Sequence, residues 1–277
     1  MTTKTWFITG TSRGFGRDWT IAALERGDRV VATARDARSL DDIAAKYGDS
    51  VLPFTLDVTS RSEAFDAVEK AYEHFGRLDV VVNNAGYGQF GMVEELSEQE
   101  ARDQIETNLF GALWVTQAAL PYLRAQRSGH IIQVSSIGGI SAFAGIGMYH
   151  ASKWALEGVS QSLALEVADF GINVTLIEPG GFSTDWGGSS AKHTTPLPAY
   201  DEARERSERF RTQRVAIAGD PVASSAAILQ LVDAPEPPLR VFFGEGPLAI
   251  ATADYESRLS MWREWEWLSI EAGGHAK

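Results

Sequence analysis

The chain of 277 residues contains no cysteine. Without thiols it can form neither a disulfide framework nor a thiolate metal site. Its five histidines are scattered and show none of the short spacings typical of metal ligands. The sequence therefore predicts no metal centre, and we expect a cytoplasmic protein.

Long hydrophobic runs and an excess of basic charge are also missing. No apolar run is long enough to cross a bilayer, and the first ten residues lack the hydrophobic region of a signal peptide. Acidic residues outnumber basic ones by 37 to 25, which gives a net charge of −12. Because nucleic acid binding depends on contacts from Lys and Arg to phosphates, we expect neither a nucleic acid nor a membrane as partner.

Apolar residues make up 44% of the chain, which is enough for a substantial core. Seven short apolar runs separated by helical stretches predict an α/β fold: a single doubly wound Rossmann-type domain with about seven mainly parallel strands and helices on both faces. No repeat, linker or composition break marks a second domain, so we expect one domain over 1–277. The predicted strands cover residues 5–9, 29–33, 51–56, 78–82, 129–135, 173–177 and 240–243.

A glycine-rich turn follows the first predicted strand and precedes a helical stretch. In a dinucleotide-binding βαβ unit, Gly10 permits the tight turn, Gly14 lets the backbone approach the phosphates, and Gly16 lets the helix pack closely on the sheet. The N–H groups and the dipole at the start of the helix favour a pyrophosphate there. The spacing is G-x-x-x-G-x-G, which any glycine-rich turn can show. The turn consists of Gly10, Thr11, Ser12, Arg13, Gly14, Phe15 and Gly16.

The end of the second predicted strand indicates which dinucleotide is bound. Many NAD-binding units have an acid there for the adenosine ribose, but this chain has Ala34 followed by Arg35. Together with Arg13 in the glycine turn, Arg35 suits a ribose 2′-phosphate, because Arg binds phosphate in a bidentate way. We therefore expect NADP(H) rather than NAD(H). Arg35 can instead be a solvated loop charge, and Asp36 can cap a helix that starts near Ala37.

Polar and small residues follow the third and fourth predicted strands. The Asp57 carboxylate can accept the adenine amino group, with Val58 against the ring, and it can also cap the helix predicted over 61–75. After the fourth strand, short amides and a glycine either line a cofactor cleft or form a plain turn. These four residues are Asn83, Asn84, Ala85 and Gly86.

Three residues between positions 136 and 153 carry a hydroxyl, a phenol and an ammonium that are expected to meet at one site. Tyr149 and Lys153 are four residues apart in a helix predicted over 147–170, so they share a helical face. Ser136 follows the fifth strand, and the glycines after it let the backbone turn into the helix. We expect the Lys153 ammonium to lower the phenol pKa from its usual value of about 10, so that Tyr149 can move a proton at neutral pH. The alternative is a surface Tyr and Lys on an ordinary helix, because YxxxK is frequent by chance.

A long helix is predicted over 97–124, with Ser97 and Glu100 forming a capping box at its start. Asn108 lies in its middle, where helix propensity disfavours this residue. A buried amide there must form hydrogen bonds. We expect Asn108 either to hold a local kink and a water or to be a satisfied core amide.

The segment after the sixth predicted strand is expected to lie over the nicotinamide end of the cleft. It includes Pro179 and Gly180, and Thr184 can bond the nicotinamide carboxamide. Residues 185–215 are predicted to form a mobile substrate lid, because their first part is rich in Gly, Ser, Thr and Pro. Within them, the charged stretch 201–211 is expected to be a solvated helix and not a binding patch.

Residues 244–277 are predicted as a C-terminal helical extension that carries several tryptophans. Trp262 and Trp265 share a helical face. Packing against the body of the protein or against another subunit is favoured over stacking on a ligand.

Taken together, these segments resemble the short-chain dehydrogenase/reductase family over almost the whole chain. Each motif is weak alone, but the ordered set is specific. The sequences N-N-A-G-Y-G and E-P-G-G-F-S-T-D-W are similar to bacterial members of the 17β-hydroxysteroid-dehydrogenase-like branch, which does not establish a steroid substrate. The motifs are the turn from Thr9 to Gly16, Asp57-Val58, Asn83-Asn84-Ala85-Gly86, Asn108, Ser136, Tyr149 with Lys153, and Pro179-Gly180 with Thr184.

The resemblance implies a role for each of four residues. Tyr149 is the general acid in reduction and the general base in oxidation, and Lys153 lowers its pKa and bonds the nicotinamide ribose. Ser136 positions the substrate oxygen, and Asn108 holds a water that links Lys153 to solvent. The nicotinamide transfers the hydride, so the protein supplies orientation and the proton. The resemblance also implies a homodimer or homotetramer.

We therefore predict an NADP(H)-dependent oxidoreductase that interconverts a ketone or aldehyde and its alcohol. The same scaffold also serves nucleotide-binding regulatory or sensor proteins without turnover, and lyases or epimerases in which the four residues do acid–base work only. Five apolar side chains either line a pocket for an apolar or aromatic substrate or belong to the core. They are Phe90, Met92, Phe143, Phe182 and Trp186.

Overall fold

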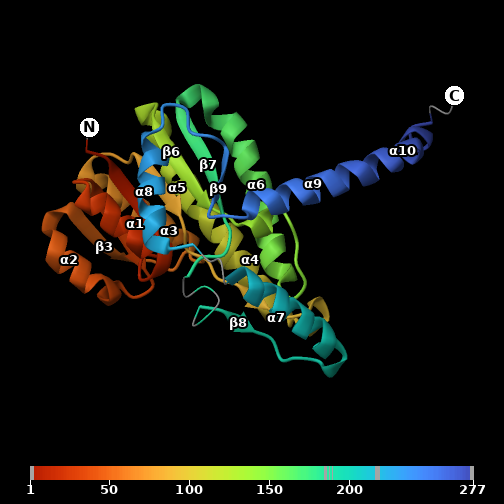
Figure 1. Ribbon diagram of the computed structural model, residues 1–277. Coiled ribbons are helices and arrows are strands. Elements are labelled where there is room, and N and C mark those ends of the chain that lie inside the picture. Colours follow the sequence, from red (N-terminus) through yellow and green to blue (C-terminus); the bar gives the residue numbers. More distant parts are fainter. Residues whose placement is uncertain (1–2, 184–185, 187, 189, 216–218, 275–277) are drawn as a thin grey trace.

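A computed structural model describes residues 3–183, 186, 188, 190–215 and 219–274. At its centre is a seven-stranded sheet in the order β3-β2-β1-β4-β6-β7-β9, in which every neighbouring pair is parallel (Figure 1). The predicted doubly wound α/β sheet is confirmed, and it is parallel throughout. Its strands are β1 (Thr5–Thr9), β2 (Arg29–Ala34), β3 (Val51–Thr55), β4 (Val80–Asn83), β6 (Gly129–Val134), β7 (Ile172–Pro179) and β9 (Arg240–Phe243).

Helices cover both faces of this sheet. Trp6 and Ile8 of β1 pack with α1, α2 and α8, whereas Phe7 between them packs with α3, α5 and α6. Because both faces are buried, most positions of the central strands are apolar, which is why these strands stand out in the sequence as apolar runs. These helices are α1 (Gly14–Glu25), α2 (Asp41–Tyr47), α3 (Arg61–Phe75), α5 (Gly111–Gln126), α6 (Gly147–Val167) and α8 (Pro221–Asp233).

Smaller elements connect or extend these strands and helices. β5 (Gln89–Phe90) pairs with β8 (Lys192–His193) in a separate two-stranded ribbon, and α7 (Asp201–Val215) follows it. Short 3₁₀ turns cover Ala37–Leu40, Gly48–Ser50, Val93–Glu95, Ile137–Gly139, Ala168–Phe170 and Pro198–Tyr200. Within the ranges described above, no helix combines the length and the apolar character that crossing a bilayer requires.

The helix predicted over 97–124 is interrupted. α4 (Glu98–Ile105) begins with the predicted capping box, in which Ser97 Oγ accepts from the Glu100 N–H at 3.2 Å. A π-helical turn, Glu106–Phe110, then separates α4 from α5, and Asn108 lies at its centre. One continuous α-helix was therefore a wrong prediction, because the π turn around Asn108 places one extra residue in a helical turn.

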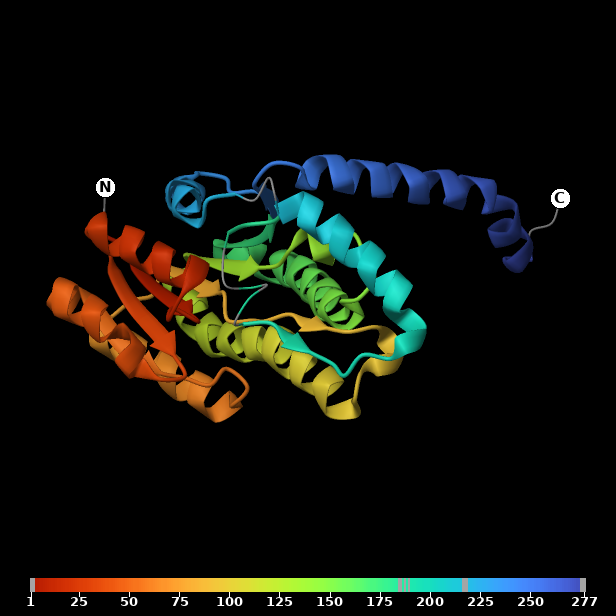
Figure 2. The ribbon, with the colours of Figure 1, turned by 60° about the horizontal axis from the view of Figure 1, so that its bottom comes forward.

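The C-terminal extension consists of α9 (Pro247–Glu264) and α10 (Glu266–Ala272), which project from the body (Figure 2). The first part of α9 is anchored: Ala251 is buried, and the Arg258 guanidinium lies 4.7 Å from the Trp154 ring centre. Beyond it, Trp262 and Trp265 are 59% and 51% exposed. Packing of these tryptophans against the body was therefore a wrong prediction, and packing against another subunit stays a prediction.

We predict that His130 makes the fold sensitive to mild acid. This side chain is buried in β6, where Nε2 bonds to Thr175 Oγ1 at 2.9 Å, and burial lowers its pKa from 6.5 to about 4. The unfolded chain therefore binds the proton more readily, so the stabilisation is complete above pH 6.5 and is lost as the pH falls towards 4. Between pH 7 and pH 5 the loss is about 2 kcal/mol, measurable by urea unfolding at the two pH values.

The matched variant is His130→Gln, which should lose about 2 kcal/mol less than the wild type over the same pH interval. His193→Gln, a change at an exposed histidine, is the control and should lose as much as the wild type. Equal acid sensitivity of His130→Gln and the wild type would contradict the role given to His130.

Candidate active site

A cleft of about 1450 Å³ opens at the carboxyl ends of the strands. Residues that directly follow β1, β4, β6 and β7 line it, among them Gly10, Asn84, Ser136 and Gly180. The strand order reverses between β1 and β4, and such a reversal is where open parallel sheets bind ligands. The topology alone therefore places a binding site here.

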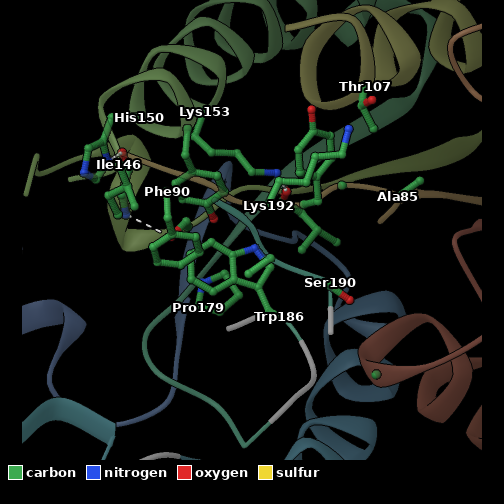
Figure 3. Close-up of a pocket in the computed structure, with 18 of the residues that line it drawn as sticks. Ala85, Phe90, Thr107, Ile146, His150, Lys153, Pro179, Trp186, Ser190 and Lys192 are labelled. Carbon is green, nitrogen blue, oxygen red and sulfur yellow. Dashed lines mark hydrogen bonds between the residues drawn. The ribbon is translucent and has the colours of Figure 1, made fainter. Parts of the chain in front are cut away.

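Ser136, Tyr149 and Lys153 meet on the wall of this cleft, as the sequence predicts. Tyr149 and Lys153 project from the first turns of α6, and both are buried, with exposures of 5% and 6%. Ser136 caps the 3₁₀ turn after β6 by accepting from the Gly138 N–H at 2.9 Å, and its hydroxyl also bonds the Tyr149 side chain. Figure 3 shows Lys153 reaching from α6 into the cleft. A phenol, a hydroxyl and an ammonium are thus presented to one place.

The expected effect of Lys153 on the phenol is not found. Burial raises the pKa of Tyr149 to about 12, and the hydrogen bond from Ser136 opposes this only in part. The Lys153 ammonium donates to the Val134 carbonyl at 2.8 Å, so it is held by the strand end and not by the phenol. Burial also lowers the pKa of Lys153 to about 8, against the attraction of Glu157. Tyr149 therefore keeps its proton at neutral pH.

Asn108 is buried beside the cleft and does not line it. Its Nδ2 donates to the Tyr87 carbonyl at 3.0 Å and to Ser152 Oγ at 3.1 Å, and its Oδ1 accepts from the Tyr87 N–H at 3.1 Å. The side chain thus ties the π turn to the loop after β4 and to α6. Both amide protons are used, which matches the satisfied core amide among the two expectations; a water held by its side chain stays a prediction.

The glycine turn is held at contact distance from the loop after β4. Gly10 has φ of +70°, in the left-handed region that favours glycine, as the predicted tight turn requires. A Cβ on Gly16 would lie 2.4 Å from the Gly10 carbonyl oxygen and 2.5 Å from Asn84 Nδ2. Asn84 Nδ2 in turn donates to the carbonyls of Thr9 and Gly10, at 2.9 and 3.1 Å. The first turn of α1 is therefore fixed directly above the ends of β1 and β4.

Most of the residues predicted to bind the cofactor line the cleft. They are Gly10, Ser12, Arg13, Gly14, Phe15, Arg35, Asp57, Val58, Ala85, Gly86, Pro179 and Gly180. Gly16 does not line the cleft but packs against the Gly10 carbonyl and the Asn84 side chain. Thr184 lies outside the described residues.

Two assignments made for residues at the strand ends were wrong. Asn83 is buried and donates from Nδ2 to Thr116 Oγ1 at 2.9 Å, so it faces α5, and the cleft residue is its neighbour Asn84. The asparagine pair correctly indicated an amide in the cleft. The alternation of side chains along the strand determines that Asn84, and not Asn83, faces the cleft. Asp57 does not cap α3; it accepts from the Thr59 N–H, and Ser60 is the cap. The predicted cap at Asp36 is confirmed, since it accepts from the Arg38 N–H at 3.1 Å.

Aromatic side chains line the cleft next to Tyr149. The Trp186 ring lies 5.4 Å from the Phe90 ring (Figure 3). It also lies 4.9 Å from the Tyr149 ring, and Phe90 stacks on His193 at 5.0 Å. A Cβ on Gly88 would lie 2.7 Å from Trp186, so Gly88, which the sequence did not single out, makes room for this indole. The five predicted apolar residues all line the cleft: Phe90, Met92, Phe143, Phe182 and Trp186.

The described part of the predicted lid lies against the loop that follows β5. Arg204 forms an ion pair with Glu95 at 2.5 Å and holds the pKa of that carboxyl at about 2, and Glu95 also accepts from the Leu197 N–H at 2.8 Å. Ala203, Arg204 and Arg206 line the cleft, so the start of α7 forms one of its walls. The sequence predicted a solvated helix over 201–211 that is not a binding patch. This prediction is corrected, because the start of that helix lines the cleft.

Comparisons with known proteins agree with this geometry. The model of the family described as short chain dehydrogenase matches residues 4–195. The chain is 41% identical over 270 residues to an oxidoreductase of Botryotinia fuckeliana, BOA17, covering 97% of this chain and 98% of that protein.

Two solved structures are similar over most of their length. A short-chain dehydrogenase from Streptomyces avermitilis superimposes with a TM-score of 0.91 at 39% identity, covering 98% of both chains. An alcohol dehydrogenase from the archaeon Thermococcus sibiricus, complexed with 5-hydroxy-NADP, superimposes with a TM-score of 0.73 at 27% identity, covering 88% of this chain and 97% of that one.

The contact between the glycine turn and Asn84 predicts the effect of a single methyl group. Gly16→Ala should destabilise the protein by about 1–3 kcal/mol, because the new Cβ meets backbone that cannot move without displacing β1 or β4. Gly158→Ala is the matched control in α6, where a Cβ meets nothing within 4 Å, and it should stabilise by about 0.5–1 kcal/mol. Urea unfolding measures both, and equal midpoints for Gly16→Ala and the wild type would show that the turn is looser than described.

Proposed function

The chain belongs to the short-chain dehydrogenase family of oxidoreductases, and from this premise we propose that it is an NADP(H)-dependent enzyme that interconverts a ketone or aldehyde and its alcohol. The observation that carries the proposal is the meeting of Ser136, Tyr149 and Lys153 in the same cleft as the glycine turn and two arginines. One site thus offers a proton donor and a place for a dinucleotide. The closer similarity to the 17β-hydroxysteroid-dehydrogenase-like branch stays a prediction.

The residues at the far end of the cleft fit a dinucleotide. The first turn of α1 has no side-chain cap from Arg13 within the described residues, so its N–H groups are available to a pyrophosphate. Arg13 and Arg35 line the cleft, and β2 ends in Ala34 without an acid. Two guanidinium groups favour a ribose 2′-phosphate, and the related archaeal alcohol dehydrogenase is complexed with an NADP derivative. These observations support NADP(H) over NAD(H).

The bound nicotinamide supplies or accepts the hydride, and the residues of the chain manage the proton. In reduction, Tyr149 donates its phenolic proton to the carbonyl oxygen, and burial keeps that proton in place until a substrate arrives. Ser136 holds the same oxygen beside the phenol. Lys153 would bond the ribose of a bound nicotinamide nucleotide, and Asn108 would support a water through which Lys153 exchanges protons with solvent.

The aromatic wall beside Tyr149 supports an apolar or aromatic substrate. Trp186 and Phe90 enclose the space next to the phenol, and Phe143 and Met92 extend it. Ligand sites of this kind are apolar, with few polar groups that fix the orientation. We infer that the carbonyl group reaches Ser136 and Tyr149 while the bulk of the substrate lies against these rings. A cytoplasmic location and a homodimer or homotetramer stay predictions from the sequence.

Tyr149→Phe should lower kcat for carbonyl reduction by about 10²–10⁴-fold, because it removes the proton donor and little else. NADPH binding, measured by fluorescence titration, should be retained. Tyr122→Phe is the control, because that phenol lies on α5 outside the cleft, and its rates should match the wild type. Undiminished turnover by Tyr149→Phe would refute the proton-donor role. Turnover by the wild type without any net change in nicotinamide absorbance would instead indicate a lyase or epimerase.

Arg35→Ala should weaken NADPH binding by about 10- to 100-fold, since a charge-assisted bond to a phosphate contributes about 1.5–3 kcal/mol. NADH has no 2′-phosphate, so its affinity should not change. Arg38→Ala is the matched control, because this exposed arginine forms an ion pair with Asp36, two residues before it in the chain. An equal loss for NADH, or a wild-type enzyme that prefers NADH, would overturn the cofactor assignment.

A further inference from the structure

Two buried carboxyl groups lie behind Lys153, on the side away from the cleft. Glu157 follows Lys153 by one helical turn on α6, and Glu178 belongs to β7; their exposures are 6% and 1%. Neither lines the cleft, and the mechanism above uses neither. Buried carboxyl groups without a partner are costly, so their surroundings must explain why they are there.

A single arginine serves both carboxyl groups. Arg240 of β9 places Nε 2.9 Å from Glu157 Oε2 and 3.4 Å from Glu178 Oε1. Its second amino group donates to Gln161 Oε1 at 2.9 Å. One guanidinium therefore faces two carboxyl groups, and it compensates one negative charge, not two.

The two carboxyl groups share one proton at neutral pH. Among the described residues, Glu157 Oε1 and Glu178 Oε1 are buried without a conventional hydrogen-bond partner, yet the two side chains are in hydrogen-bonding contact. Two ionised carboxylates in contact repel each other, and a proton between them removes the repulsion. Burial, followed by the charge of Glu157, raises the pKa of Glu178 to about 8. Burial also raises the pKa of Glu157, but Ser135, Arg240 and Lys153 oppose that rise, so Glu178 is the protonated member. The pair then carries one negative charge, on Glu157.

The Glu157 carboxylate attracts the Lys153 ammonium, one helical turn away on α6. The charged groups that face Glu157 are Lys153 on its own helix and Arg240 on β9, and the Glu178 side chain contacts it from β7. The Ser135 hydroxyl lies beside it from the end of β6. A Cβ on Gly139 would lie 2.7 Å from Ser135 Oγ and 3.2 Å from Glu157 Oε1, so the turn that carries Ser136 covers the pair. The pair is thus separated from the cleft by the catalytic turn itself.

We propose that Glu157 is a positioning residue that acts through Lys153: its single negative charge keeps the buried Lys153 ammonium protonated, while neutral Glu178 holds Glu157 in place through their shared proton. This inference rests on the proposed function, because Lys153 matters only if a proton moves at Tyr149. Burial alone disfavours the ammonium, and Glu157 provides the opposing attraction. The enzyme then retains a charged Lys153 at neutral pH without a carboxylate in the cleft that would repel the cofactor phosphates.

The test is the pH profile of kcat for carbonyl reduction, measured between pH 6 and pH 10. Glu157→Gln keeps the size of the side chain and removes its charge, so the alkaline limb should move to lower pH by about 1 unit or more. Glu166→Gln makes the same change at an exposed position of α6, and its limb should coincide with that of the wild type. Glu157→Asp keeps the charge, so its alkaline limb should lie close to that of the wild type. A limb that does not move in folded Glu157→Gln would overturn the proposal, and so would an equal shift in Glu157→Asp.

A second measurement tests the shared proton without any activity. The folded state holds a proton on Glu178 that the unfolded chain releases above pH 4.5, so the contribution of this carboxyl group to stability falls as the pH rises from 5 towards 8, opposite in sign to the contribution of His130. Glu178→Gln mimics the protonated form and lacks this loss, so its Tm should rise relative to that of the wild type over this interval. Parallel Tm curves would overturn the proposal even if Glu157→Gln does not fold. If the wild type reduces no carbonyl compound, the proposed function fails, whereas the Tm comparison still decides the state of the pair.

Discussion

A buried ammonium is the feature around which the active end of this protein is built. Lys153 has little contact with water, and a charge in that position persists only if nearby groups satisfy it. The Val134 carbonyl accepts one of its protons, and Glu157 attracts it from the next helical turn. The same burial keeps the Tyr149 phenol protonated. The Tyr149 phenol therefore holds its proton firmly, and the neighbouring Lys153 ammonium holds its proton less firmly.

The opposite end of the cleft is built from backbone in close contact. Gly10 and Gly16 leave no space for a side chain, and Asn84 bonds the carbonyl groups of the turn. Polar backbone groups at the start of α1 consequently face the cleft, where an anion can satisfy them. The two ends differ in chemistry, one suited to phosphates and the other to moving a proton, and the sheet edge fixes the distance between them.

Much of the fold and of the site could be predicted from local patterns. The apolar runs marked the strands because both faces of the sheet are covered, and Ser97 with Glu100 marked a helix start through bonds within four residues. The helical spacing of Tyr149 and Lys153 placed both on one wall. The predictions that failed depend on distant neighbours. The pKa of Tyr149 depends on burial by several elements, and the choice between Asn83 and Asn84 depends on which face meets α5.

The amino-acid sequence was sufficient to predict the seven strands of the sheet and the glycine turn, because these follow from periodicity and from the conformations that single residues allow. The candidate catalytic side chains followed from the ordered set of family motifs. Contacts between segments that are far apart in the sequence determine the ionisation of the buried groups. Arg240, Glu157 and Glu178 come from three separate segments, and no spacing rule links them. Their ionisation depends on desolvation and on one another, and both arise only when β7, β9 and α6 are assembled.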